Sequence, residues 1–122
     1  MMVQSHELTS DDATKLERLL NAIDLFADQV DKDMPMQMIR AFLFAAIYEG
    51  EGPNELARKA GVSSTVMSRH ISDLGDINRY KLGGHELIYQ KTDPMDRRSR
   101  KVHLTPKGVA FRNKLVRALG RK

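Results

Sequence analysis

The sequence predicts a mostly α-helical domain with one small β-hairpin, which is an α+β fold class. Three observations predict it. Apolar residues recur every three or four positions in segments at both ends of the chain, which is the period of an amphipathic helix. Between these segments, a glycine separates two short helical patterns, and two runs of strand-forming residues flank a turn. The 122 residues suffice for a single domain, 1–122, with one core.

The composition excludes several kinds of site. The chain has no cysteine, so it has no disulfide, no thiolate metal site and no thiol redox chemistry. Its longest apolar run, residues 41–48, is too short to span a bilayer. Polar residues follow Met1 and Met2, where a secretory signal would be apolar. We therefore expect a soluble cytoplasmic protein with no membrane partner.

Charge is distributed unevenly along the chain. Residues 1–53 hold four Lys/Arg against ten Asp/Glu, a balance of −6, whereas residues 76–122 hold thirteen against four, a balance of +9. Residues 54–75 contribute +1, which completes the net charge of +4. Such asymmetry is typical of a protein whose basic half meets a polyanion such as nucleic acid. The alternative is a solvated basic tail.

Two helices are expected in the first half of the chain. The first, at about residues 9–32, has Thr9 and Ser10 as suitable N-cap residues. Its apolar stripe consists of Leu16, Leu19, Leu20, Ile23, Phe26 and Val30. The second helix has Pro35 in its first turn and ends before Gly50. Its apolar residues point to nearly all sides, which predicts a buried helix: Met36, Ile39, Phe42, Leu43, Ala46 and Ile47.

Residues 54–75 indicate two short helices joined by a tight turn. Asn54 is expected to cap the first helix, Gly61 to allow the turn, and Ser63 to cap the second helix. One stripe of the second helix is apolar and is expected in the core: Met67, Ile71 and Leu74. This spacing is that of a helix-turn-helix. The alternative is a plain helical hairpin, since such hairpins with a glycine turn are common in all-α proteins.

The opposite face of the second helix, residues 63–74, is small and polar. Its hydroxyl groups and one guanidinium present no bulky obstruction, as a helix needs when it enters a DNA major groove. There, hydroxyls can bond to bases or phosphates, and an arginine can contact guanine through two hydrogen bonds. The candidate DNA-binding residues on this helix are Ser63, Ser64, Thr65, Ser68 and Arg69, and Ser72 shares their face.

A hairpin follows the helix-turn-helix. Residues 87–89 begin a strand, Asp93-Pro94 opens a turn, and residues 102–104 form a returning strand with alternating faces. A hairpin in this position is the wing of a winged-helix domain, whose core we place at residues 35–108. The wing, residues 93–101, is expected to reach the neighbouring minor groove with four basic residues held at its tip: Arg97, Arg98, Arg100 and Lys101.

Residues 54–108 resemble the MarR family of bacterial winged-helix transcriptional regulators, as a short variant of a phage- or plasmid-like kind. The most specific part is DPMDRRSRKVHLTPKG, Asp93 to Gly108. The resemblance implies that Asp96 and Arg98 match the family's Asp-x-Arg pair. Arg98 is then the residue inserted into the minor groove, and Asp96 holds it in place. The alternative makes Asp96 a turn residue and Arg98 plain surface.

The last helix is expected at residues 106–119, with Thr105 as its cap and an apolar stripe of Phe111, Leu115 and Leu119. The resemblance implies a homodimer formed by the N- and C-terminal helices, which holds two winged helices over a pseudo-palindromic site. The stripes at residues 16–30 and 111–119 are then the interface. The alternative is that both stripes close the monomer's own core. The short last helix predicts a smaller or weaker dimer, or one built mainly from the first helix.

Residues 75–92 form a longer link than the family usually has. Arg79 and Lys81 in this link are expected to contact DNA phosphates. The alternative is a loop interrupted by Gly83 and Gly84.

The sequence contains none of the common catalytic motifs, so we expect no enzyme and no cofactor. His85 and His103 can approach each other across the hairpin, but two histidines without a third ligand favour surface positions over a metal site. Many proteins of the resembled family respond to small molecules. Met34, Met36 and Met38 are candidates for an adaptable inducer pocket, and the alternative assigns them to core and linker.

We therefore expect a sequence-specific, double-stranded-DNA-binding transcriptional regulator that acts as a homodimeric repressor. The rival hypothesis is a winged helix that serves architecture, replication or maintenance of a mobile element, or that contacts another protein. The two differ in base discrimination. A regulator binds its site on the order of a thousandfold or more tighter than random duplex, and an architectural module does not.

Overall fold

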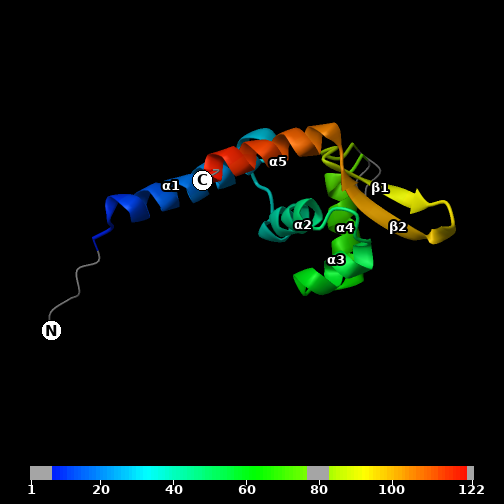
Figure 1. Cartoon of the computed structure of the whole chain (residues 1–122). Helices are drawn as coiled ribbons and strands as arrows, with labels where there is room; N and C mark the ends of the chain where they lie inside the picture. The colour runs from blue at the N-terminus through cyan, green and yellow to red at the C-terminus, as the bar shows by residue number, and fades with distance from the viewer. Residues whose placement is uncertain (1–6, 77–82, 121–122) are drawn as a thin grey trace.

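The computed structural model describes residues 7–76 and 83–120 and shows a mostly helical chain with one antiparallel hairpin (Figure 1). This is the fold class that the sequence predicts. The elements, in chain order, are α1 (Ser10–Gln29), α2 (Met36–Ile47), α3 (Pro53–Ala60), α4 (Ser64–Leu74), β1 (Ile88–Asp93), β2 (Asp96–Leu104) and α5 (Pro106–Leu119).

Helices α1 and α5 lie side by side along one edge of the molecule, and the other elements lie on one side of this pair (Figure 1). Thr9 caps α1 as predicted, because its hydroxyl oxygen accepts a hydrogen bond of 2.9 Å from the Asp12 amide. Helix α1 is longer than α5, and Gly120 at the end of α5 lies against the guanidinium of Arg18. The N-terminal part of α1 therefore runs on past α5 (Figure 1).

A cluster of three phenylalanines joins the paired helices to the rest of the core. Phe26 of α1, Phe42 of α2 and Phe111 of α5 pack edge to face, with ring centroids 5.0 to 6.0 Å apart. Edge-to-face packing is a favourable geometry for aromatic rings at these distances. The cluster packs α2, which in turn contacts α3 and α4, against the α1–α5 pair.

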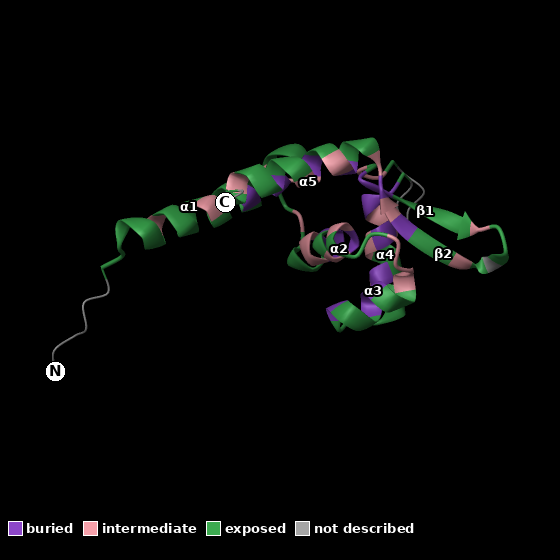
Figure 2. Cartoon of the chain, in the orientation of Figure 1, coloured by how far each residue is buried: buried purple, intermediate pink, exposed green. Residues whose placement is uncertain are grey.

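Helix α2 is buried on one side only, which corrects the prediction of a helix buried nearly all round. Met38, Ala41, Phe42 and Ala45 face the core, whereas Met36 and Ile47 are 76% and 68% exposed. The buried side packs on α3, α4 and β2. Apolar composition shows that a face can be buried, but only the tertiary arrangement decides whether a neighbour covers it (Figure 2).

The helix-turn-helix forms at the predicted residues, with one shift. Gly61 adopts φ +73°, the left-handed conformation that the turn requires, and the Ser63 hydroxyl accepts from the Val66 amide at 3.1 Å. Asn54 does not cap α3, because Gly52 is the N-cap and Pro53 takes the first helical position, for which proline is suited. Asn54 therefore lies within the first turn, and its side chain is exposed.

The hairpin is anchored to the core at its base. Ile88 pairs with Leu104, and both side chains are buried. The connection between α2 and α3 also pairs with β2. The Gly50 amide donates to the Val102 carbonyl at 2.8 Å, and the Val102 amide donates to the backbone carbonyl of Glu51 at 2.9 Å. The outer part of the hairpin extends beyond these contacts and projects from the domain (Figure 1).

Candidate nucleic-acid interface

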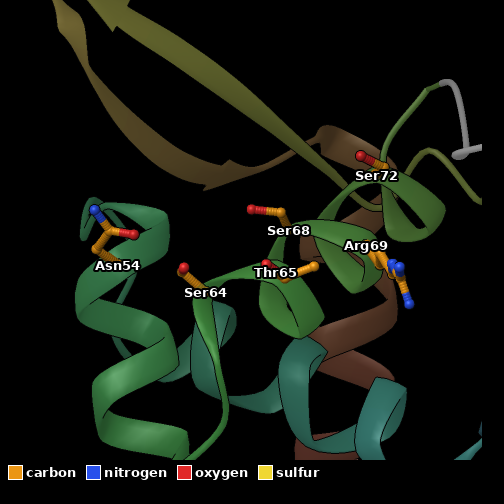
Figure 3. Close-up of a pocket in the computed structure, with 6 residues that line it drawn as sticks. All are labelled: Asn54, Ser64, Thr65, Ser68, Arg69 and Ser72. Carbon is orange, nitrogen blue, oxygen red and sulfur yellow. The ribbon is translucent and has the colours of Figure 1, made fainter.

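The polar face of α4 lines an open concavity of about 380 Å³ between α3 and α4 (Figure 3). Its lining residues are Asn54, Ser64, Thr65, Ser68, Arg69 and Ser72. The buried stripe of Met67, Ile71 and Leu74 holds the opposite side of α4 in the core. The structure thus presents together the α4 residues that the sequence pattern selected, apart from Ser63, whose hydroxyl caps the helix.

The chemistry of this face is that of a hydrogen-bonding surface. Hydroxyl groups both donate and accept, and the Arg69 guanidinium only donates. None of the lining residues carries a carboxylate. An edge of a base or a phosphate oxygen can therefore approach without meeting negative charge.

Asn54 also lines this concavity, although the sequence predicts it as a helix cap. In Figure 3 it stands on α3, across the concavity from Ser64 of α4. Its amide can donate and accept, so it adds a polar contact from a second element. The signal in the sequence was Pro53, since a proline at the first helical position moves the cap one residue back, to Gly52.

The second strand of the wing contains a bulge. The regular pairing runs from Ile88 and Leu104 to Thr92 and Arg100, and then jumps to Asp93 and Asp96. Residues 97–99 therefore have no partner in the register. A bulge bends its strand and redirects its side chains, and the Arg98 side chain is 97% exposed.

Asp96 holds the backbone of this bulge and also faces Arg98. Its Oδ1 atom accepts from the Arg98 amide at 3.1 Å and lies 4.0 Å from the Arg98 Nε atom. The contact with Nε is the one that the Asp-x-Arg resemblance implies, while the bond to the backbone amide also fits the alternative in which Asp96 is a turn residue. At this exposure the ion pair itself stabilises the fold very little.

The basic residues do not form the tip of the hairpin, which corrects the sequence analysis. The turn consists of Pro94 and Met95, and Asp93 closes it by accepting from the Met95 amide at 2.8 Å. Arg98, Arg100 and Lys101, which the sequence predicts at the tip, lie along β2 instead. The physical reason is that Asp93-Pro94 fixes an early, tight turn, so the residues after Asp96 already belong to the returning strand.

A further basic residue of the wing is Lys91, which the sequence analysis did not select. It is the direct cross-strand partner of Lys101, and both side chains are exposed. Like charges directly opposite each other on a hairpin are unfavourable. A polyanion bound against this part of the wing would relieve that repulsion.

At the base of the wing, Glu49 joins the end of α2 to β2. Its carboxylate accepts from the Leu104 amide at 3.0 Å and lies 3.7 Å from Nδ1 of His103. The His103 ring stacks on Tyr89, with centroids 5.5 Å apart. Within residues 7–76 and 83–120, His, Cys, Asp and Glu form no group of three that could hold a metal ion.

Two sets of predicted contacts cannot be placed. Arg79 and Lys81 belong to residues 77–82 of the link, which lie outside the described residues. The side chain of Arg97 also lies outside the described part of the structure.

The predicted dimer stripes are divided between core and surface. Leu16, Leu19, Leu20 and Ile23 of α1 are 48% to 56% exposed, and Leu119 of α5 is similarly exposed (Figure 2). Four predicted interface residues instead contribute to the chain's own core, as the alternative stated. Phe26, Phe111 and Leu115 are buried, and Val30 is partly buried against them.

The three methionines considered for a pocket do not share one environment. Met38 is in the core, Met34 packs partly against it, and Met36 is exposed. They therefore form no common wall, and the assignment to core and linker fits Met34 and Met38.

No helix of the described residues is both long enough and apolar enough to cross a membrane.

The helix-turn-helix, the hairpin beside it and the paired terminal helices define a winged-helix domain with long flanking helices. No protein-family model matches the sequence, and neither does any curated protein. Solved structures do match. The chain has the fold of MarR-like transcriptional regulators, which is the fold that its resemblance to that family implies.

Three of these solved structures illustrate the match. The regulator PcaV of Streptomyces coelicolor, solved with its natural ligand, has 18% identity and a TM-score of 0.58, over 98% of this chain and 79% of that one. FabT of Streptococcus pneumoniae, solved with DNA, has 17% identity and a TM-score of 0.62, over 81% and 63%. The S. aureus MepR–DNA complex has 15% identity and a TM-score of 0.63, over 87% and 76%.

Proposed function

We propose that this protein is a sequence-specific, double-stranded-DNA-binding transcriptional regulator that acts in the cytoplasm. The observation that carries the proposal is the open, hydroxyl-rich face of α4 beside a basic wing strand. The fold around this face is shared with FabT and MepR, both solved in complex with DNA.

Each part of the surface suits one part of a duplex. An α-helix fits the major groove, where the hydroxyls of α4 and Arg69 meet the edges of bases. The wing projects beside α4, and the bulge directs Arg98 outward, toward the adjacent minor groove. Inserted arginines are favoured there by the negative potential of a narrow groove.

We also propose that the protein acts as a homodimer. The exposed leucines and isoleucine on α1 form a continuous apolar stripe, which water solvates poorly. Helix α1 extends away from the wing, so a second copy can cover these residues while both α4 faces remain open (Figure 1). Two copies related by a two-fold axis match a pseudo-palindromic site. Occupancy of such a site at a promoter would repress transcription.

The test is selection of bound duplexes from a random library by the purified protein at physiological salt, followed by sequencing. We expect an enriched motif with two-fold symmetry. Retention of duplexes without any enriched motif, with a steep dependence on salt, would replace the regulator by the architectural alternative, because backbone contacts alone produce that behaviour.

A further inference from the structure

If α4 occupies the major groove and the wing reaches the next minor groove, one DNA backbone has to pass between them. The two grooves of a duplex are separated by a sugar-phosphate strand, so any protein that enters both must cross it. The surface between α4 and the wing therefore has to accommodate a phosphate. This inference rests on the proposed function and assigns residues to that crossing.

The structure has a second concavity at this crossing. It measures about 220 Å³ and lies between the start of α3 and the bulged part of β2. Its walls are residues 52–55 on one side and residues 98–101 on the other. Asn54 lines this concavity and also the one beside α4, so it stands at the boundary between them.

The two walls of this cleft are held at a fixed separation. Next to both walls in the sequence, backbone hydrogen bonds join Val102 to Gly50 and Glu51. A β-carbon at Gly52 would lie 3.0 Å from the carbonyl oxygen of Arg100, which is closer than ordinary contact allows. Glycine at this position therefore lets β2 approach the start of α3, so the cleft is formed before DNA arrives.

The charge of the cleft is positive. Arg98, Arg100 and Lys101 contribute three cationic side chains from β2. The acidic side chain in the lining is Glu55, whose carboxylate pairs with Arg58 on the same helix. The hydrogen bond from Arg58 lowers the pKa of the Glu55 carboxyl, and the pair carries no net charge.

We propose that Asn54 donates a hydrogen bond from its side-chain amide to the DNA phosphate that separates the two grooves, and that Arg100 and Lys101 supply the charge beside it. Asn54 is suited to this position because an amide can donate to a phosphate oxygen without the hydration cost of a charged group. The contact carries no base information, but it sets the depth at which α4 and the wing enter their grooves.

The experiment uses duplexes that carry one uncharged methylphosphonate at successive positions across the bound site. Their dissociation constants are measured for the wild type, for Asn54→Ala and for Asn113→Ala. Asn113 is an exposed asparagine on α5, away from the cleft, and serves as the matched control. Thermal melting of each variant without DNA shows that the fold is kept.

We expect Asn54→Ala to weaken binding about tenfold on every duplex sequence, the loss typical of one hydrogen bond to a charged group. Asn113→Ala should bind as the wild type does. At one backbone position, the methylphosphonate should weaken the wild type more than it weakens Asn54→Ala, because the variant has already lost the amide contact while Arg100 and Lys101 lose their attraction to the charge in both proteins. The slope of log affinity against log salt concentration should be unchanged in Asn54→Ala and should fall by about one unit in Arg100→Ala. Of these two residues, only the charged arginine neutralises a phosphate and so displaces a counterion from the DNA.

Three results would overturn the assignment. They are unchanged affinity of Asn54→Ala, an equal response of wild type and Asn54→Ala to the methylphosphonate at all positions, and a loss that depends on base sequence. If the wild type binds its selected site while one of these holds, the inference fails and the proposed function stands. If the wild type binds no duplex, both fail.

Discussion

Arg98 is the residue on which the proposed minor-groove contact depends. It lies in the bulge of β2, outside the regular pairing, and Asp96 contacts both its backbone amide and its side chain. Arg98→Ala should lower DNA affinity on the order of tenfold, or about 1.4 kcal/mol. Its melting temperature should stay the same, because the side chain is exposed. A titration of labelled duplex together with a melting curve measures both, and unchanged affinity would remove the assignment.

Arg69 is the one guanidinium on the recognition face of α4. If it contacts guanine through two hydrogen bonds, Arg69→Ala should relax base preference at one position by roughly 1 to 3 kcal/mol. Affinities for a set of duplexes substituted at each base of the half-site measure this effect. An equal loss over all the duplexes would make Arg69 a phosphate contact.

At the scale of single residues, local chemistry could be predicted and pairing across the fold could not. The caps Thr9, Ser63 and Thr105 follow from hydroxyl residues placed just before helical patterns, and all three accept the expected bond. The proposed roles of Asn54 and Lys91 could not be predicted, for a different reason. Their roles depend on neighbours from other segments, which spacing along the chain does not reveal.

In the hairpin, one substitution should raise the stability of the fold and lower its affinity for DNA. Lys91→Glu would convert the opposed pair with Lys101 into an attractive one. Stability should rise by about 0.2 to 1 kcal/mol, the range for cross-strand pairs. DNA affinity should fall, because a positive charge near the backbone becomes negative. Urea unfolding and duplex titration measure the two effects, and a gain in both quantities would contradict a role of this wing surface in binding.

At the scale of elements, the order and type of the helices and strands followed from periodicity, caps and turn residues. The exposure of α2 did not follow. Its apolar residues surround the helix, yet Met36 and Ile47 remain exposed because α3, α4 and β2 cover only one side. The bulge in β2 also escaped prediction, since register is set by pairing with β1 and by the early turn at Pro94.

The whole molecule depends on the exposed stripe of α1 for the proposed dimer. The double variant Leu16→Glu and Leu20→Glu places two charges in that stripe, where both leucines are half exposed in the single chain. Sedimentation should show a monomer that is still folded. Its affinity for a full two-fold site should fall toward its affinity for a single half-site.

Met95→Glu is the matched control for this variant, because Met95 is an exposed apolar residue at the wing turn. It should leave the sedimentation of the protein unchanged. A double variant that still sediments as the wild type does would exclude the α1 stripe as the interface.

For the whole molecule, the sequence could predict the winged-helix fold and the basic segment, residues 76–122, that contains the wing. It could not decide whether the terminal stripes close the chain's own core or meet a second copy. The structure divides them: Phe26 and Phe111 pack inside, while Leu16 and Leu20 stay exposed. Leu16 precedes Arg18, where α1 continues past the end of α5, whereas Leu20 follows Arg18 on a face of α1 that stays 56% exposed.

Sequence-specific recognition is the central claim, and the ratio of two dissociation constants tests it most directly. One is for the duplex selected from the random library, and the other is for the same bases in scrambled order, both at physiological salt. We predict that the selected duplex binds about a thousandfold or more tightly, as regulators do. Equal affinity for the two duplexes would contradict the account and leave a protein that binds the DNA backbone without reading its sequence.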